Sequence, residues 1–390
     1  MPPAEESDTS REGDVVAFEL WRLPGDFFSL EPEAQWEAFA RITVQPKKVS
    51  QPRQACELTF SEDLTVSAFL LVILGVPLLI PGVFLLLLAM GSTYLKWFVA
   101  VVLVLAFHPI PKYKASHRRS RIGVLLAKYF TATVLLRREA PGFEHAGTAE
   151  IDRNPPRAPV VALACPHGVL NFGAIIWVFF SRWICGREQY TAGVSAVQMV
   201  PGLRYLVAPL WVIRVDRKSL KRRLQEEPQI LDADGKPSST RALRRGGMIG
   251  IVPDGIAGIF RSKPGEDVLF IGKKRGLMRI CLEEGAMIMG GWFSGTSDLF
   301  HIVVDPLGIM EWISRKMQVS LFLFFGRWGL PIPRRISVTL CAHVVQAEKK
   351  AAPTEEEVEA LHQTVYGGMS RAFEEMRHFA GYPERRLVVL

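Results

Sequence analysis

The segment from Leu64 to Phe107 constrains the fold of this chain more than any other feature. It contains one charged residue, Lys96, and is otherwise dense in Leu, Val, Phe and Ile. A helix crosses the ~30 Å hydrocarbon layer of a bilayer with about 20 apolar residues. The segment is long enough for two such helices or for one bent hairpin. We therefore expect a membrane segment and a function compatible with a membrane.

Glycine and proline interrupt the apolar segment and leave two arrangements open, because both residues break a helix. One arrangement has helices at about 64–90 and 92–107, and the other bends at Pro77–Gly82 into a re-entrant hairpin. Both return the chain to the side from which it entered. The alternative, a buried core helix, typically needs only about 10 to 14 apolar residues.

Charge is distributed unevenly on the two sides of the apolar segment. Residues 1–63 carry 13 acidic and six basic side chains, and we expect a partly disordered cytosolic head in which Phe18–Phe39 docks as a short helix. A basic cluster after the segment favours anionic headgroups and a cytosolic location. No nucleic-acid motif accompanies this cluster, so nucleic acid is not the expected partner. The cluster consists of Lys112, Lys114, Arg118, Arg119 and Arg121.

The five cysteines are scattered and lack CxxC spacing. This pattern indicates reduced thiols in a cytosol-facing protein, and neither a disulfide framework nor a zinc site. No metal-ligand cluster and no glycine-rich nucleotide motif is present, so we expect no cofactor. The cysteines are Cys56, Cys165, Cys185, Cys281 and Cys341.

Residues 108–390 are expected to form one cytosol-facing α/β domain. Apolar strand-like segments alternate with helical ones, which predicts a mixed, largely parallel sheet with flanking helices. Thr354 precedes three glutamates and is a suitable N-cap for the last helix. The expected strands are Val160–Ala164, Trp211–Val215, Met248–Val252, Ala286–Phe293 and Ile336–His343, and the expected helices are Arg217–Glu226, Lys274–Gly285 and Glu355–Phe379.

The sharpest candidate for chemistry is His167, in the sequence Cys165-Pro166-His167-Gly168 directly after an apolar strand. Ligands of open α/β sheets bind beyond the carboxyl ends of strands. A neutral imidazole there can accept a proton from an alcohol. Asp216 and Asp254 follow two other strands and are candidates to orient His167. The alternatives are a histidine without a role in a loop, and aspartates that cap the following helices.

A fourth region, Val319–Arg335, combines an aromatic stretch with basic residues. It is either a buried element followed by a loop, or an apolar surface that meets lipid or lines an acyl tunnel, with arginines at the interface. The number of aromatics beside a basic loop favours the second interpretation.

Together these motifs resemble the type-2 diacylglycerol acyltransferase family, which includes monoacylglycerol acyltransferases and wax synthases, over roughly Phe84–Tyr382. Pro166-His167-Gly168 is similar to its catalytic motif, with Cys165 at a variable first position. Gly326–Arg335 resembles its Gly-Arg…Gly-Leu-Pro-Ile-Pro-Arg-Arg block and is the most specific match. Two weaker matches are Lys274-Arg275-Gly276 followed by Glu284-Gly285-Ala286, and Phe84-Leu85-Leu86-Leu87, which is similar to a proposed neutral-lipid motif.

The chain departs from this family at Pro253-Asp254-Gly255-Ile256-Ala257-Gly258. The family has Pro-Gly-Gly-x-x-Glu there, so its glutamate is replaced by Gly258, and Asp254 is the adjacent acid that can substitute. The outline is also similar to glycerophosphate-type acyltransferases. Those enzymes carry His-x4-Asp, whereas Phe172 stands five positions after His167, which argues against a phosphate-bearing acceptor.

The resemblance implies an acyl-CoA-dependent O-acyltransferase that makes triacylglycerol from diacylglycerol at the endoplasmic reticulum membrane. Both termini would be cytosolic, and a lipid-droplet surface and a homo-oligomer are compatible with it. Another acceptor, monoacylglycerol or a long-chain alcohol, and a non-catalytic lipid-binding protein remain alternatives. The implied catalytic residues are His167 as general base, Pro166, Gly168, Asn171 for the oxyanion and Asp254; the implied substrate contacts are Phe84, Leu85, Leu87, Asp216, Arg217, Arg334 and Arg335.

Overall fold

The structure is a computed structural model of the 390-residue chain. Lys112 and Lys114 of the expected basic cluster, and Lys274, lie outside the described residues. The structure describes residues 14–91, 93–108, 118–154, 156–193, 207, 210–227, 229–231, 243–271, 275–303, 305, 307–317 and 322–390.

The centre of the molecule is a ten-stranded mixed sheet with the order β2-β1-β3-β13-β10-β4-β8-β5-β6, in which β7 also pairs with β8. The strands β10, β4, β8, β5 and β6 run parallel to one another, and β13 runs antiparallel to β10. The expected mixed, largely parallel sheet is confirmed. The strands are β1 (Val15–Phe18), β2 (Thr43–Val44), β3 (Thr133–Arg137), β4 (Val160–Cys165), β5 (Glu188–Gly193), β6 (Val212–Arg214), β7 (Gln229–Leu231), β8 (Leu243–Ile251), β10 (Met287–Ser294) and β13 (Thr339–Gln346).

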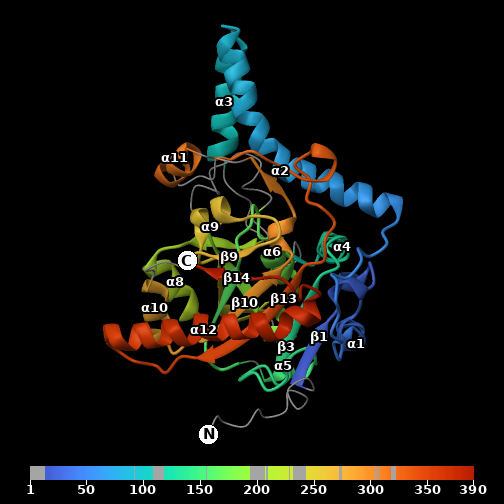
Figure 1. The fold of residues 1–390 in the computed structure, drawn as a ribbon, viewed down its shortest axis with the longest axis vertical. Helices are drawn as coiled ribbons and strands as arrows, with labels where there is room; N and C mark the ends of the chain where they lie inside the picture. Colours follow the sequence, from blue (N-terminus) through green and yellow to red (C-terminus); the bar gives the residue numbers. More distant parts are fainter. Residues whose placement is uncertain are drawn as a thin grey trace.

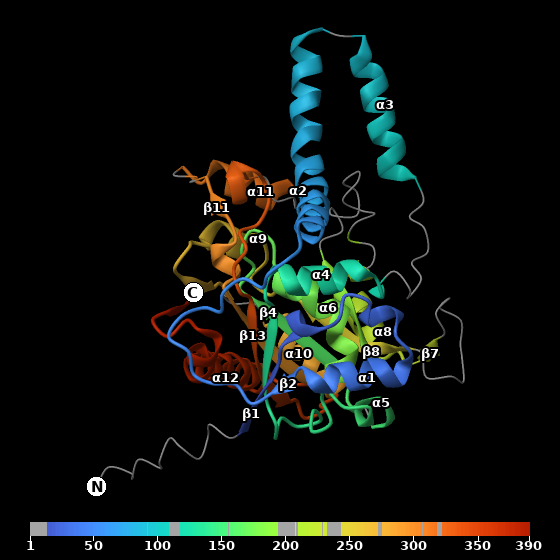
Figure 2. The same ribbon diagram turned by 90° about the vertical axis from the view of Figure 1, so that its right-hand side faces the viewer.

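Helices cover both faces of the sheet (Figures 1 and 2). Side chains of a strand alternate between faces, so Val160 and Ala162 of β4 join the core with α4 and α6, whereas Val161 and Leu163 join the core with α10 and α12. Thr354 caps α12 with a reciprocal capping box, as its sequence predicts. The helices are α4 (Arg121–Tyr129), α5 (Glu150–Arg153), α6 (Phe172–Cys185), α8 (Arg217–Leu224), α10 (Gly276–Glu284) and α12 (Glu355–Ala380).

The segment expected to be a separate acidic head contributes to the main sheet from residue 14 onward. Strand β1 pairs with β3 along its whole length. The helix expected near Phe18–Phe39 is α1 (Pro32–Arg41). Its Phe39 is fully buried and stacks on Trp183 of α6, with ring centroids 6.1 Å apart. Aromatic packing therefore joins this segment to the α/β domain.

The apolar segment forms two helices, α2 (Phe60–Ala89) and α3 (Tyr94–Phe107), that project from the body as the two arms of a hairpin (Figure 2). Their bounds agree with the two-helix arrangement and not with a bend at Pro77–Gly82. Large apolar side chains on both arms are more than half exposed, which is unusual for a monomeric soluble protein. They are Leu79, Leu85, Leu86, Leu88, Met90, Tyr94, Trp97, Val101, Val104 and Phe107.

Within the described residues, no helix combines the length and the sustained apolarity required to cross a bilayer. The expected membrane-spanning helix is therefore not confirmed.

The root of the hairpin is fixed to the body by ion pairs. Thr59 and Glu62 form a capping box at the start of α2. The next residue, Asp63, receives both arms of the Arg327 guanidinium at 2.7 and 2.8 Å. Bidentate pairs of this kind hold orientation as well as distance. The root of α2 is thus tied to the Gly326–Arg335 block.

Arg118, which belongs to the basic cluster after the hairpin, does not form part of an exposed cationic surface. This side chain is 2% exposed and forms an ion pair with the buried Glu188 of β5 at 3.1 Å. Its guanidinium also lies over the Trp211 ring at 3.6 Å. The expectation that Arg118 faces lipid headgroups is wrong, because its charge is used to pair an acid inside the domain.

The remaining elements surround the carboxyl edge of the parallel strands. Strand β14 (Leu387–Val389) pairs with β9 (Asp267–Leu269), and β11 (His301–Ile302) pairs with β12 (Phe324–Phe325). Helix α9 (Gly255–Arg261) follows β8 directly and lies between the sheet and the hairpin in Figure 1, and α11 (Ile309–Met317) lies beside the hairpin in both views (Figures 1 and 2). The carboxyl edge of the sheet therefore faces the hairpin.

The five thiols are free, and four of them are buried while Cys56 is partly exposed. Burial raises the pKa of Cys281 and of Cys341 to about 12. Cys56 stands just ahead of the hairpin, where its backbone N–H donates to the Thr131 hydroxyl at 2.8 Å.

Candidate active site

His167 lies on a tight turn at the carboxyl end of β4. The preceding Cys165–Pro166 peptide bond is cis, and Gly168 has a φ of +58°. A Cβ at Gly168 would approach Thr296 Cγ2 to 2.9 Å and the Thr296 carbonyl oxygen to 3.2 Å. Only glycine fits both this φ and this contact. The turn holds the half-buried His167 at the edge that faces the hairpin.

Asp254 holds this turn from the neighbouring strand. Its Oδ2 accepts the backbone N–H of His167 at 2.8 Å, and its side chain is fully buried. β4 and β8 are adjacent and parallel, so their carboxyl ends meet at the edge where ligands of such sheets bind. Burial, and then the charge of Asp254, raise the pKa of Cys165. Through its hydrogen bond to the His167 N–H, Asp254 fixes the histidine backbone, whereas the sequence suggested that it orients the ring.

One contact of the His167 ring indicates which of its two nitrogen atoms carries the proton in the neutral imidazole. Its Nδ1 lies 3.1 Å from the carbonyl oxygen of Gly168. A carbonyl only accepts, so this contact is a hydrogen bond when Nδ1 carries the proton. That tautomer leaves the Nε2 lone pair as the basic site.

The space over Gly258 is filled by the Asp254 carboxyl group. A Cβ at position 258 would lie 2.5 Å from Asp254 Cγ and still closer to Oδ2. Positions 254 and 258 are four residues apart and share one side of α9. A side chain at 258 and the Asp254 carboxyl group therefore exclude each other.

Asn171, considered for the oxyanion, is used to shape the loop. It is the N-cap of α6, and its Oδ1 accepts the Ala174 N–H at 2.8 Å. Its Nδ2 donates to the Pro166 carbonyl at 2.9 Å. Both ends of this buried amide thus connect the histidine turn to the start of α6.

Asp216 and Arg217 are not brought to His167. Asp216 caps α8 by accepting the Ser219 N–H at 2.9 Å, which is also the largest cause of the lowered pKa of Asp216. Arg217 pairs with Glu283. Strand β6, which precedes them, is separated from β4 by β8 and β5. The helix-cap alternative accounts for Asp216.

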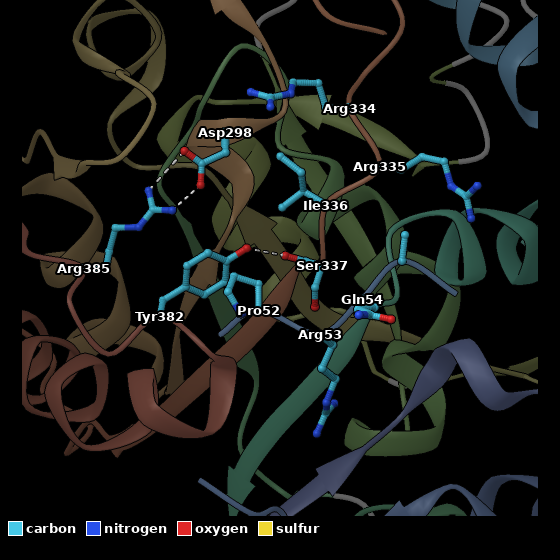
Figure 3. Close-up of a pocket in the computed structure, with 11 residues that line it drawn as sticks. Pro52, Arg53, Gln54, Asp298, Arg334, Arg335, Ile336, Ser337, Tyr382 and Arg385 are labelled. Carbon is cyan, nitrogen blue, oxygen red and sulfur yellow. Dashed lines mark hydrogen bonds and ion pairs between the residues drawn. The ribbon is translucent and has the colours of Figure 1, made fainter. Parts of the chain in front are cut away.

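Arg334 and Arg335 stand before β13, at the same edge as His167, and line a cavity of about 600 Å³ (Figure 3). Sequence reasoning missed the residues that complete this cavity, because they come from distant segments. These are Pro52–Ala55, Asp298, Ile336, Ser337, Tyr382 and Arg385.

Phe84, Leu85 and Leu87 lie in the second half of α2, on the hairpin that projects from the body (Figure 2). Phe84 and Leu85 are exposed there. The structure thus places the apolar motif on the hairpin and the histidine on the sheet edge.

No group of three or more His, Cys, Asp or Glu side chains suited to a metal ion occurs among the described residues. The site consists of a basic imidazole on a fixed turn, a cavity lined by arginines along the same edge, and apolar arms beyond it. This arrangement suits proton transfer to and from a substrate with a charged end and an apolar end.

Comparison with known proteins gives one family. Residues 146–390 match the model of the family described as diacylglycerol acyltransferase. Human 2-acylglycerol O-acyltransferase 1 is 25% identical over 242 residues, which cover 58% of this chain and 67% of that protein. Mouse acyl-CoA wax alcohol acyltransferase 2 is 25% identical over 245 residues (58% and 69%), and bovine diacylglycerol O-acyltransferase 2-like protein 6 is 22% identical over 250 residues (59% and 69%). No solved structure matches the chain.

Proposed function

Because the chain belongs to the diacylglycerol acyltransferase family, whose members are acyl-CoA acyltransferases, we propose that it transfers an acyl group from acyl-CoA to diacylglycerol and releases triacylglycerol. The observation that carries this proposal is the His167 turn, which Asp254 and Asn171 fix at the sheet edge facing the hairpin. The turn lies inside the matched residues, whereas the hairpin lies outside them.

His167 acts as the general base in this proposal. Nε2 takes the proton from the acceptor hydroxyl as its oxygen attacks the thioester carbonyl. The tetrahedral oxyanion is stabilised by backbone N–H groups around Gly168. When the carbon–sulfur bond breaks, the leaving sulfur of CoA receives the proton from the imidazolium. The histidine returns to its starting state, and no covalent enzyme intermediate forms.

The hairpin supplies the lipid contact. Diacylglycerol is dissolved in lipid, and the arms expose apolar side chains such as Leu85, Trp97 and Phe107 beyond the sheet edge. Exposed patches of this size mark interaction surfaces. We place the protein at the endoplasmic reticulum membrane, with the hairpin also suited to the monolayer of a lipid droplet.

A second acceptor class is favoured by the names of the relatives. Two of the relatives above are called 2-acylglycerol and wax alcohol acyltransferases. Monoacylglycerol and long-chain alcohols carry the same attacking hydroxyl, so the His167 chemistry applies to them unchanged.

The test is acyl transfer by microsomes that contain wild type, His167→Ala or His145→Ala, given labelled oleoyl-CoA with diacylglycerol, monoacylglycerol or fatty alcohol. His145 is exposed and serves as the matched control. We expect triacylglycerol from wild type and the control, and a loss of about 10²-fold or more for His167→Ala at equal protein level. Activity that survives His167→Ala removes this base from the mechanism. Inactivity on every acceptor favours a non-catalytic lipid-binding protein.

A further inference from the structure

The cavity beside β13 is built by segments that are far apart in the sequence. Pro52–Ala55 precede the hairpin, Asp298 follows β10, Arg334–Ser337 precede β13, and Arg385 follows α12. The cavity has a volume of about 600 Å³ and is broadly open to solvent. Figure 3 shows Arg385 turned toward Asp298 beside Ile336, Ser337 and Tyr382, whereas the guanidinium groups of Arg53 and Arg335 point away from that centre.

The lining carries four guanidinium groups and one carboxylate. Arg385 is buried and engages that carboxylate, Asp298, with both arms. Arg53 donates to Thr133 at 2.7 Å and pairs with Glu19 at 3.2 Å. These two arginines are therefore already balanced by acids.

Arg334 and Arg335 supply the excess charge. No described carboxylate lies within ion-pair distance of either. Arg335 donates to the carbonyl of Cys56, and the exposed Arg334 lies 3.4 Å from His301 Nε2. Neither contact neutralises a guanidinium. An anion is thus the complementary ligand, and guanidinium groups match phosphate geometry best.

The cavity and the His167 turn lie on either side of the segment Gly295–Thr296. Ser294 of β10 is in register with Thr339 of β13, so the cavity lies at the carboxyl edge, one strand away from β4. A Cβ at Gly295 would meet the Ser337 carbonyl and the Tyr382 hydroxyl, both of which line the cavity or belong to residues that do. The next residue, Thr296, touches Gly168. A ligand with its charged end in the cavity can therefore lie along the edge toward His167.

We propose that this cavity binds the phosphate-bearing nucleotide end of the acyl donor, with Arg334 on the phosphates, Arg335 adding positive charge from its position on the Cys56 carbonyl, and Ile336 and Pro52 as an apolar wall for the base. The proposal rests on the proposed function, because it takes acyl-CoA as the donor. It adds the segment before the hairpin, through Pro52 and Arg53, to the donor site. The donor then extends from this cavity to His167, while its acyl chain lies on the hairpin side.

The test measures binding without catalysis. The full chain in detergent is titrated calorimetrically with adenosine 3′,5′-bisphosphate, which carries the 3′-phosphate and one of the two 5′-phosphates of CoA but no acyl chain. The variants are Arg334→Gln and Arg334→Gln/Arg335→Gln. The control Arg41→Gln/Arg222→Gln removes two exposed arginines elsewhere, on α1 and α8. Because Arg334 is exposed, its single variant retains the fold, which the melting temperature checks.

We expect the bisphosphate to bind wild type and control equally and each Arg334 variant about tenfold or more weakly. In transfer assays the KM for acyl-CoA rises while the KM for the acceptor does not. Unchanged affinity in both variants overturns the proposal, and acyl transfer would then stand without this donor site. Arginine-dependent binding with no activity on any acceptor would instead overturn the acyltransferase.

Two further arms identify the source of the phosphate. Inorganic phosphate that binds as tightly as the bisphosphate would show that the cavity does not recognise a nucleotide. Vesicles containing phosphatidic acid that bind in an Arg334-dependent manner, with no binding of the bisphosphate, would assign the cavity to a lipid headgroup. Either result contradicts the nucleotide proposal.

Discussion

At the scale of single residues, Asp254 and Gly258 act as a pair. The carboxylate that fixes the His167 backbone comes from position 254, and the glycine at 258 makes room for it. The family pattern that the sequence resembles has glycine at 254 and glutamate at 258. In this chain the acid is supplied one helical turn earlier.

This pairing predicts that the carboxylate can be moved. The Cβ position of residue 258 lies close enough to Asp254 Oδ2 for an aspartate side chain at 258 to place its own oxygen there. Asp254→Gly removes the acceptor of the His167 N–H, and we expect kcat to fall about 10- to 100-fold. Asp254→Gly/Gly258→Asp should recover most of that loss, as measured by acyl transfer.

Gly258→Asp alone is the matched control, because it retains Asp254 and adds a second carboxyl group to the same space. It should be less stable than wild type by about 1–3 kcal/mol, as overpacking usually is. If the double variant is no more active than Asp254→Gly, the carboxylate position is not what the turn requires.

At the scale of elements, strand β9 carries a titratable group, Asp267, whose contacts are with residues from later parts of the chain. Asp267 is fully buried, accepts from Ser297 at 3.1 Å and from Trp292 at 3.3 Å, and lies 3.8 Å from Arg385. Burial is the largest influence and raises the pKa of Asp267 to about 6, against the opposing effect of Arg385. The folded protein therefore holds this proton more tightly than the unfolded chain does.

The pH dependence follows from that difference. As pH rises from about 4 to about 6, the unfolded carboxyl group ionises while the buried one stays protonated, so the free energy of unfolding falls. The full effect is about 3 kcal/mol at 1.36 kcal/mol per pKa unit. Asp267→Asn cannot ionise, so its stability relative to wild type should rise across this range. Urea unfolding at pH 4, 5, 6 and 7 measures it.

Glu37→Gln, which removes an exposed carboxylate of α1, is the control for loss of one acid. A constant difference between Asp267→Asn and wild type at all four pH values would contradict a raised pKa.

The elements with a clear local pattern were predictable from the sequence. Strand β4 and helix α12 follow from an apolar run and from apolar residues at helical spacing. Helix α6 was missed because Phe172–Cys185 is buried on nearly all sides, so no polar face reveals its period. Strand β1 was missed because its four residues form a strand only by pairing with β3, which is distant in the sequence.

The site divides along the same line. The approach of Asp254 to His167 was one of two possibilities that the sequence suggested, because Asp216 also follows a strand. Only the strand order of the sheet decides between them. The cavity was not predictable, since Arg53 and Arg385 reach Arg334 only through tertiary packing. Arg118 shows the opposite error, because a basic run near an apolar segment gives no sign that one member pairs with Glu188 inside the domain.

At the scale of the whole molecule, one edge of the sheet gathers the polar and the apolar functions. The carboxyl ends of β4 and β8 and the root of the hairpin lie on that side (Figures 1 and 2). The cavity before β13 is at the same edge, because the start of β13 pairs with the end of β10. The Asp63–Arg327 pair ties the hairpin to the loop that precedes β13. A water-soluble donor and a lipid-dissolved acceptor can thus approach His167 from opposite directions.

Because four of the five thiols are buried, the reactivity of the cysteines reports whether the protein is folded. Maleimide should modify Cys56 alone in the native protein and all five cysteines after denaturation, as intact mass spectrometry would show. The native reaction should be slow, because burial raises the pKa of Cys56. Native labelling that also reaches Cys56→Ser would contradict the burial of the others. A fluorophore placed there, without any added cysteine, sits between hairpin and cavity and can follow both in one experiment.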